Sequence, residues 1–254
     1  MVPPIWLTDL SPPGTRARAG SPNRLEPRRR CPRAALTSLA YGRPVASVHD
    51  LERAVDHAFD RTARGLLRWP DPHPDRMPLD EEYSRVLDPS KWRIIPARAE
   101  AWCTAAVELG IATLQRDVAV RWVEGGGAHH HRIDRLVPRV EGGLPLVLAH
   151  AGLAGEVPGV TIAIGDPAVV VGLSPDCGCD ACDAGSEREL EHLDEQIRMV
   201  VSGSVRHLSA GDRTIVSTDR GISATGRFRR REIEKVLATP HGWHEVSGAS
   251  WIAV

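Results

Sequence analysis

The sequence predicts an α+β protein in which an antiparallel or mixed sheet packs against three to four helices. The order of the elements indicates this class, because helical periods come first, extended segments fill the middle and mixed elements follow, without regular βαβ alternation. Hydrophobic residues make up 42% of the chain and charged residues 26%, which is ordinary for a packed globular protein.

Residues 1–40 are predicted to be a disordered, basic, Pro/Arg-rich extension. Up to Arg33 the chain has seven Pro and seven Arg against two acids. So few apolar side chains cannot offset the entropy lost on ordering. We therefore expect a single domain over residues 41–254. A disordered tail or a misassigned translation start explains the extension better than contact with an acidic partner.

Two helices are predicted in the first half of this domain. Apolar side chains step by three and four residues over 48–66, and Pro70 follows the end of this helix. A loop rich in proline comes next. Pro96 suits the first turn of a second helix over about 97–115.

Two further helices are predicted nearer the C-terminus. Ser186 and Glu189 have the spacing of a capping box and open a helix with a buried stripe up to Val201. Gly203 is placed to end it. The last predicted helix spans 229–238.

Extended segments fill most of the remaining chain. A glycine-aspartate-proline turn at 165–167 lies between two of them and predicts a hairpin. The predicted strands are 118–123, 133–140, 144–150, 160–165, 168–173, 205–208, 214–218 and 221–225, with an extended end at 243–254.

The segment 176–183, with the sequence D-C-G-C-D-A-C-D, carries the distinctive chemistry. Cys177 and Cys179 point to the same side of an extended segment. Cys179 and Cys182 have the C-x-x-C spacing that lets a tight turn direct two sulfurs at one metal ion. We therefore predict that Cys177, Cys179 and Cys182 are metal ligands and that zinc is the cofactor. An Asp, a distant His or Cys, or a second subunit would supply the fourth ligand.

Two other interpretations of the cysteines stay open. They precede a helix N-terminus, where the helix dipole lowers a thiol pKa and favours redox or nucleophilic use, although neighbouring carboxylates oppose this shift. Alternatively, the cysteines are small residues that pack a strand-to-helix turn. Without an export signal we expect the reducing cytoplasm, where a disulfide framework is disfavoured.

The stretch 159–208, above all the heptad Cys-Gly-Cys-Asp-Ala-Cys-Asp at 177–183, resembles an uncharacterised actinobacterial family of unknown function, DUF6226. The run from Gly242 to Trp251 is similar to this family as well. The resemblance covers the C-terminal half of the chain. It implies a cytosolic bacterial setting and no particular activity.

Other polar clusters are expected to serve the surface or the core. The histidines at 129–131 follow three glycines and are predicted to form an exposed loop tip rather than a metal site. His150 is expected to be a buried, satisfied histidine. His192 is a solvated residue or the fourth zinc ligand. Arg227 and the arginines at 229–231 are predicted to form a solvated face rather than an anion site.

The function expected from these patterns is a non-catalytic bacterial interaction or regulatory module with a protein partner. The sequence contains no G-x-x-x-x-G-K-S/T, G-x-S-x-G or H-E-x-x-H motif. A net charge of −1 argues against nucleic acid as a partner, and no apolar run is long enough for a membrane span. The alternative is a thiol-dependent redox protein or enzyme that uses Cys179 and Cys182.

Overall fold

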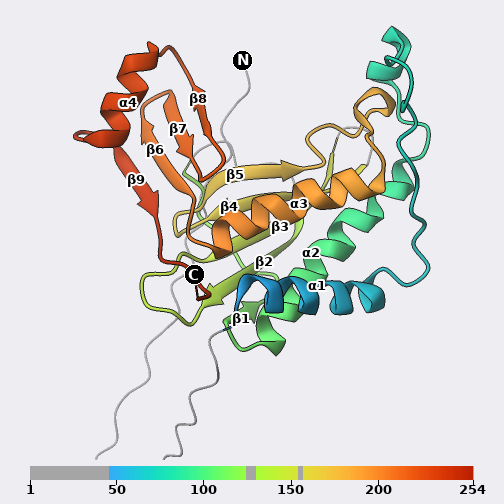
Figure 1. Cartoon of the computed structure of the whole chain (residues 1–254), viewed down its shortest axis with the longest axis horizontal. Helices are drawn as coiled ribbons and strands as arrows, with labels where there is room; N and C mark the ends of the chain where they lie inside the picture. Colours follow the sequence, from blue (N-terminus) through green and yellow to red (C-terminus); the bar gives the residue numbers. More distant parts are fainter. Residues whose placement is uncertain (1–45, 124–129, 154–156, 254) are drawn as a thin grey trace, which may run out of the picture. The chain divides into compact units, whose positions relative to one another are not determined.

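The computed structural model describes residues 46–123, 130–153 and 157–253, which all belong to the compact unit Gly42–Val254. This part of the chain contains four α-helices and two antiparallel sheets, which confirms the α+β class (Figure 1). The extension expected at 1–40 lies outside the described residues. Within the described ranges, no helix has the length and apolar character needed to cross a membrane.

A five-stranded antiparallel sheet forms the centre of the fold. Each strand pairs with the next one along the chain, in the order β1-β2-β3-β4-β5. β3 and β4 pair along their whole length, from Leu146 opposite Ile164 to Leu153 opposite Val157. The strands are β1 (Ala112–Gln115), β2 (His130–Pro138), β3 (Leu146–Leu153), β4 (Val157–Ile164) and β5 (Val169–Ser174).

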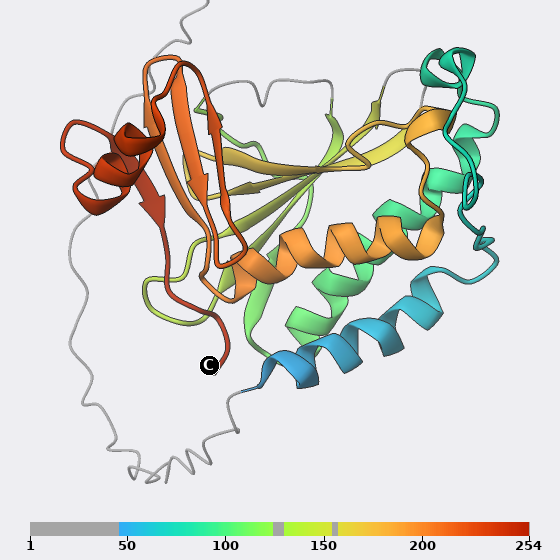
Figure 2. The ribbon, with the colours of Figure 1, turned by 45° about the horizontal axis from the view of Figure 1, so that its top comes forward.

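Three helices lie on one face of this sheet (Figure 2). α2 and α3 contact the strands directly, and α1 packs against α2. Trp92, Trp102, Leu148, Ile162 and Leu193 are fully buried in the single hydrophobic cluster between helices and sheet. Removing these side chains from water is the main favourable contribution to folding. The helices are α1 (Val48–Thr62), α2 (Ile94–Glu108) and α3 (Ser186–Val201).

The C-terminal part of the chain forms a second sheet in the order β8-β7-β6-β9. Leu208 and Ile215 of this sheet share a small core with Val236 of α4. The chain then returns to the first core, where the Trp251 side chain is buried and the backbone N–H of Trp251 donates to Val201 O at 2.8 Å. The elements are β6 (Arg206–Ala210), β7 (Arg213–Ser217), β8 (Ile222–Thr225), α4 (Arg230–Ala238) and β9 (His244–Ser247).

The helix predicted at 97–115 is wrong at both ends. α2 begins at Ile94 and ends at Glu108. Gly110 then adopts a φ of 71°, a left-handed conformation that glycine reaches without steric cost and that stops the helix. Leu114, which lies within the predicted helix, belongs to β1 instead.

The strand predicted at 118–123 does not join a ladder. Trp122 makes only an isolated parallel bridge to Ala168. Val120 and Trp122 pack against Val147 and Ala163, on the face of the sheet opposite the helices. The alternating pattern therefore identified a half-buried segment correctly, but this segment packs on the face of the sheet, and its backbone hydrogen bonds to Ala168 and Ile133 do not extend into a ladder.

The other predicted elements are confirmed with shifted ends. The hairpin predicted around 165–167 is formed by β4 and β5. The first helix ends at Thr62 rather than at Leu66. The extended end predicted at 243–254 is a strand only over β9.

Candidate metal centre

The cysteine motif forms the connection between β5 and α3. The sulfur atoms of Cys177, Cys179 and Cys182 all lie within 4.8 Å of one another. Those of Cys177 and Cys179 are 3.2 Å apart. A 3₁₀ turn over Asp180–Cys182 directs Cys182 back, and its N–H donates to Cys179 O at 3.2 Å. The three thiols thus form a cluster that could hold a metal ion.

The cluster opens on a groove of about 770 Å³. Cys177 and Cys182 are exposed and line this groove, whereas Cys179 is buried. α3 contributes Glu189 and His192 to the lining. A Cβ at position 178 would come within 2.6 Å of the Val157 side chain, so a glycine is needed there for the motif to lie this close to β4.

The thiols differ in acidity. Burial raises the pKa of Cys179, but hydrogen bonds from Cys177, from Cys182 and from nearby backbone N–H groups outweigh it, so this pKa lies below its usual value. Burial and its hydrogen bond to Cys179 raise the pKa of Cys182 to about 12. In α2, burial raises the pKa of Cys103 far above its usual value, so this thiol is unreactive.

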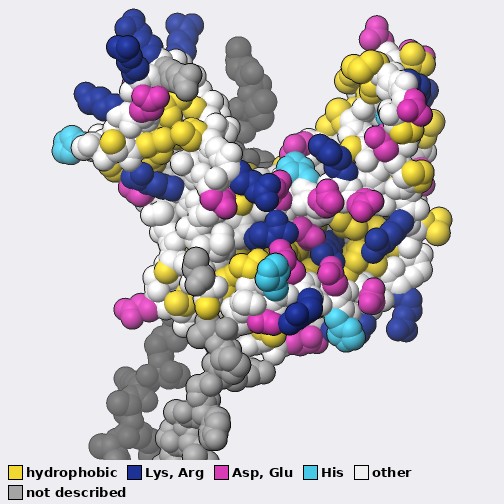
Figure 3. All heavy atoms as spheres, in the orientation of Figure 1, with side chains coloured by type: hydrophobic (Ala, Val, Ile, Leu, Met, Phe, Trp, Pro, Cys, Tyr) yellow, Lys and Arg dark blue, Asp and Glu magenta, His cyan; other side chains and the backbone are white. Residues whose placement is uncertain are grey.

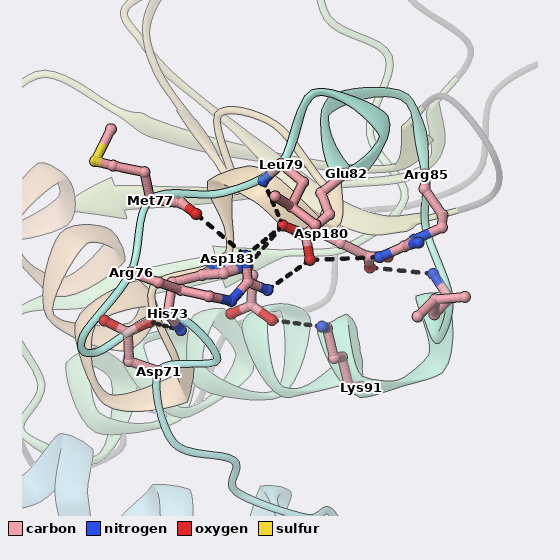
Figure 4. A network of polar contacts seen from close by, with 11 residues as sticks. Asp71, His73, Arg76, Met77, Leu79, Glu82, Arg85, Lys91, Asp180 and Asp183 are labelled. Atoms are coloured by element: carbon pink, nitrogen blue, oxygen red, sulfur yellow. Dashed lines mark hydrogen bonds and ion pairs between the residues drawn. The ribbon is translucent and has the colours of Figure 1, made fainter.

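Two carboxylates of the motif, Asp180 between the cysteines and Asp183 directly after them, bind a different part of the chain, which we call the arm and define as residues 69–91 (Figure 4). Asp180 accepts hydrogen bonds from Arg85 Nε at 2.9 Å and from Leu87 N at 3.1 Å. Its own N–H donates to Arg85 O at 2.8 Å. The arm therefore binds both oxygens of Asp180.

Asp183 makes the second attachment of the arm. Its side chain is 1% exposed and forms a short ion pair with Lys91. Trp69 Nε1 donates to Asp183 at 2.8 Å, and the Gly185 N–H donates at 2.9 Å. The Lys91 ammonium also lies 5.5 Å from the ring centroids of Trp69 and Trp92, a cation–π arrangement. Every contact of this carboxylate is thus directed at the arm or at the start of α3.

The capping box predicted for Ser186 is wrong. The N-cap of α3 is Gly185, with a φ of 83°, and a Cβ there would lie 2.6 Å from the backbone nitrogen of Asp71. The Ser186 hydroxyl instead donates to Trp69 O at 3.0 Å and accepts from Trp69 N at 3.1 Å. A sequence typical of helix capping therefore serves to bind the arm.

Within the arm, Glu82 is the central polar group. Its two oxygens accept hydrogen bonds from Arg76 at 2.7 and 2.8 Å, and one also accepts from Leu79 N at 2.7 Å. These bonds hold the pKa of Glu82 far below its usual value. The side chain stays charged and fixes the arm as a folded loop.

The predicted histidine sites fall in different places. His192 lines the same groove as the cysteines but bonds to Gln196 at 2.7 Å and does not belong to the sulfur cluster. The histidines at 130–131 begin β2, so the expected loop tip is wrong for them, and His129 lies outside the described residues. His150 is buried, as predicted.

The arginines near α4 whose side chains the structure describes lie on the surface, as predicted, and the side chain of Arg230 lies outside the described part. Arg227, Arg229 and Arg231 are exposed. In contrast, Arg213 of β7 lies over the rings of Phe228 and Trp243, at 4.2 and 5.3 Å. The basic run therefore flanks a stacked aromatic cluster of the second sheet.

Sequence reasoning missed the residues of the arm that bind the motif. Trp69, Arg85 and Lys91 are separated from their partners by 114, 95 and 92 residues. Their only signal was the series of prolines that predicted a rigid loop. Residue spacing contains no information on which distant carboxylate such a loop contacts.

We expect Asp183→Ala to lower the free energy of unfolding by about 3 kcal/mol, because Lys91 loses its counter-ion and Trp69 Nε1 its acceptor. Urea unfolding followed by tryptophan fluorescence measures this change. Asp176→Ala, at an exposed carboxylate of the same motif, is the control and should cost less than about 0.5 kcal/mol. Similar losses in the two variants would contradict the role given to Asp183.

Glu189→Gln should change the pH dependence of stability. Burial, with the charges of Asp183 and Asp176, raises the pKa of Glu189 from 4.5 to about 7. The Glu189 carboxyl group therefore binds its proton more tightly in the folded chain than in the unfolded chain. As the pH rises from 4.5 towards about 7, loss of this proton lowers the free energy of unfolding. In metal-free protein, urea midpoints of wild type and variant should agree near pH 4, and the variant should be more stable near pH 8. A difference independent of pH would refute this.

Comparison with known proteins identifies the family of this chain. No curated protein and no solved structure matches the chain. The model of one family, described as a family of unknown function (DUF6226), matches residues 55–251. This range contains the arm, both sheets and the cysteine motif, and it is most of the sequence. The chain therefore belongs to the DUF6226 family.

Proposed function

We propose that this chain is a non-catalytic protein-interaction module of the bacterial cytoplasm, in which a zinc ion bound by Cys177, Cys179 and Cys182 keeps the arm in place. The observation that carries this proposal is that the thiols of the motif converge on one point while two carboxylates of the same motif, Asp180 and Asp183, bind the arm. One ion at the sulfurs would therefore stabilise the turn that holds the arm.

Zinc suits these ligands. Sulfurs within 4.8 Å of one another can all reach a single ion at the usual Zn–S distance of about 2.3 Å after small side-chain adjustments. A bound ion ionises its thiol ligands outright, which overcomes the raised pKa of Cys182. Glu189 and His192 are among the side chains from outside the motif that line the same groove, and either could complete the tetrahedron.

The arm has the apolar surface expected of a protein-binding site. Met77 is 81% exposed and Leu87 is 73% exposed, and Leu79 and Tyr83 are also more than half exposed. Figure 3 shows hydrophobic and acidic side chains together on the surface formed by the arm, at the upper right. Exposed apolar side chains that gather on one rigid segment mark an interaction site rather than a random surface.

The charges around these side chains indicate the kind of partner. The arm's basic residues Arg76, Arg85 and Lys91 all form ion pairs with carboxylates. The exposed surface of the arm is predominantly acidic, since four of its carboxylates are exposed: Asp75, Asp80, Glu81 and Asp88. An apolar patch with an acidic rim complements a protein whose apolar patch has a rim of Lys and Arg.

Metal analysis tests the zinc site. Untagged protein should hold about one zinc per chain, and Cys179→Ser and Cys182→Ser should lose it. Cys103→Ala is the matched control, because this buried cysteine lies in α2 outside the motif, and it should keep the ion. Chelation should speed hydrogen exchange in residues 69–91 and 176–186 more than in α1. Metal-free protein of unchanged stability would mean that the cysteines only pack a turn.

Photo-crosslinking in cells tests the interaction. A photoreactive residue at Met77 should form one defined product with another protein, and a residue at exposed Arg139 should not. Asp80→Lys combined with Glu81→Lys, and separately Cys182→Ser, should abolish the product. A product of twice the chain's own mass would identify a second copy and refute the basic partner. Turnover of a small molecule, lost on a substitution outside the cysteines, would refute the non-catalytic function.

A thiol-redox function is the second candidate. The 3.2 Å between the sulfurs of Cys177 and Cys179 and the lowered pKa of Cys179 favour it. Oxidised glutathione would take two electrons and two protons from the thiols as their disulfide forms, and would leave as two reduced molecules. This candidate fails if no cysteine of the metal-free protein ionises below about 8.5 when thiolate absorbance is titrated.

A further inference from the structure

A second cluster of charges lies beneath the helices, on β2 and β3. Its centre is Asp134, whose side chain is fully buried. Asp134 Oδ2 lies 2.8 Å from Arg116 Nη1, 2.9 Å from Arg132 Nη2 and 3.4 Å from His150 Nε2. Glu100 of α2 binds the same two arginines, at 2.6 Å and 3.1 Å. We call these five residues the Asp134 cluster.

The sheet register builds this cluster. Arg132 lies directly opposite His150 in the β2–β3 ladder, and Asp134 follows two residues later on the same face. A register shift between His130 and Arg132 interrupts the alternation, and the ring of His131 comes within 6.3 Å of that of His150. Such bulges turn side chains towards a common site.

The Asp134 cluster lies at the side of a cavity of about 850 Å³, a size that suits a small organic molecule. Arg116, Arg132 and His150 line it directly. Arg64 and Arg93 stand at its edge, exposed, and have no ion pair within the described ranges of the chain. Apolar side chains complete the lining: Leu66, Pro96, Ala151 and Pro158.

The charges of this cavity favour a negatively charged ligand. Four arginines line it, against Glu100 and Asp117 in the lining and Asp134 behind it, which leaves a surplus of one positive charge (4 − 3). Arg132 bonds to the protein through Nη2, and its Nη1 makes no bond to the described residues. Burial and the charge of Arg132 lower the pKa of His150 to about 4, so its imidazole is neutral at physiological pH.

A purely structural role explains this arrangement poorly. Asp134 Oδ1 and Arg132 Nε are buried without a hydrogen-bond partner among the described residues, which is a cost to stability. Buried ion pairs are in general no more stabilising than apolar side chains of similar volume. Pre-positioned arginines beside a cavity are, in contrast, what recognition of an oxyanion requires.

We propose that this cavity binds a small organic molecule through an oxyanion, a phosphate or a carboxylate, which Arg132, Arg93 and Arg64 contact. The buried carboxylate of Asp134 fixes Arg116 and Arg132 in place, and His150 offers the ligand a neutral hydrogen-bonding group. The apolar lining contacts the rest of the molecule. This site uses neither the cysteine motif nor the arm, so it does not depend on the function proposed for them.

Calorimetric titration of the full chain with pyrophosphate and with succinate tests the site and distinguishes the two classes of oxyanion. Arg93→Ala and Arg64→Ala should each weaken binding of the better probe at least about fivefold, because each removes one charge-assisted contact. Arg139→Ala is the matched control, an exposed arginine outside the cavity, and should leave affinity within about twofold.

The rim variants should fold normally, because neither guanidinium has an ion-pair partner in the described part of the chain. Arg132→Lys keeps the charge but loses the planar fork, and we expect it to bind about tenfold more weakly than wild type. Binding of either probe with this pattern supports the site. No saturable binding of either probe up to about 10 mM, or equal effects of Arg93→Ala and Arg139→Ala, would overturn it.

Discussion

The ion pair between Asp183 and Lys91 joins segments 92 residues apart, and the candidate metal centre depends on it. Asp183 is almost fully enclosed and Lys91 is 19% exposed, so each charge loses most of its hydration and is compensated by the other. The same carboxylate binds the backbone N–H of Gly185, where α3 begins. The pair therefore fixes the end of the motif relative to the arm, and with it the turn in which Cys182 points towards Cys179.

The sequence could predict the parts of this centre that depend on local geometry. The C-x-x-C spacing of Cys179 and Cys182 already places two sulfurs on one side of a turn, and the structure brings the three thiols together. The roles of Asp180 and Asp183 could not be predicted in the same way. Their partners, Arg85 and Lys91, lie in a distant proline-rich loop, and residue spacing does not identify such contacts.

Residue spacing does not identify distant contacts, and this also explains the errors in the fold predicted from the sequence. Residues 118–123 have a convincing extended pattern, but a pattern of alternation shows only that one side is buried, not whether the partner is a strand edge or a sheet face. The Asp134 cluster is a stronger case, because Glu100, Arg116 and Asp134 come from different elements. None of them stands out in the sequence, and only the packing of α2 on the sheet brings them together.

The helix pair α2 and α3 supports both candidate sites. Asp194 of α3 accepts hydrogen bonds from Arg98 Nη2 and Trp102 Nε1 of α2, each at 2.6 Å. Asp194 also lines the groove beside the cysteines, whereas Glu100 of the same α2 lines the cavity beside the Asp134 cluster. The buried polar contact between the helices fixes their register, so each site has one rigid wall.

The charges of the motif explain why its cysteines and carboxylates belong together. If all three thiols were ionised, they and the two carboxylates within the same seven residues would repel one another strongly in a partly buried turn. Arg85 and Lys91 of the arm neutralise Asp180 and Asp183, but no cation of the arm pairs with the sulfurs. A divalent ion bound to the thiolates would remove most of the remaining negative charge. The arm thus neutralises one half of the motif and a bound ion would neutralise the other, so the loss of either one would loosen the turn that both require.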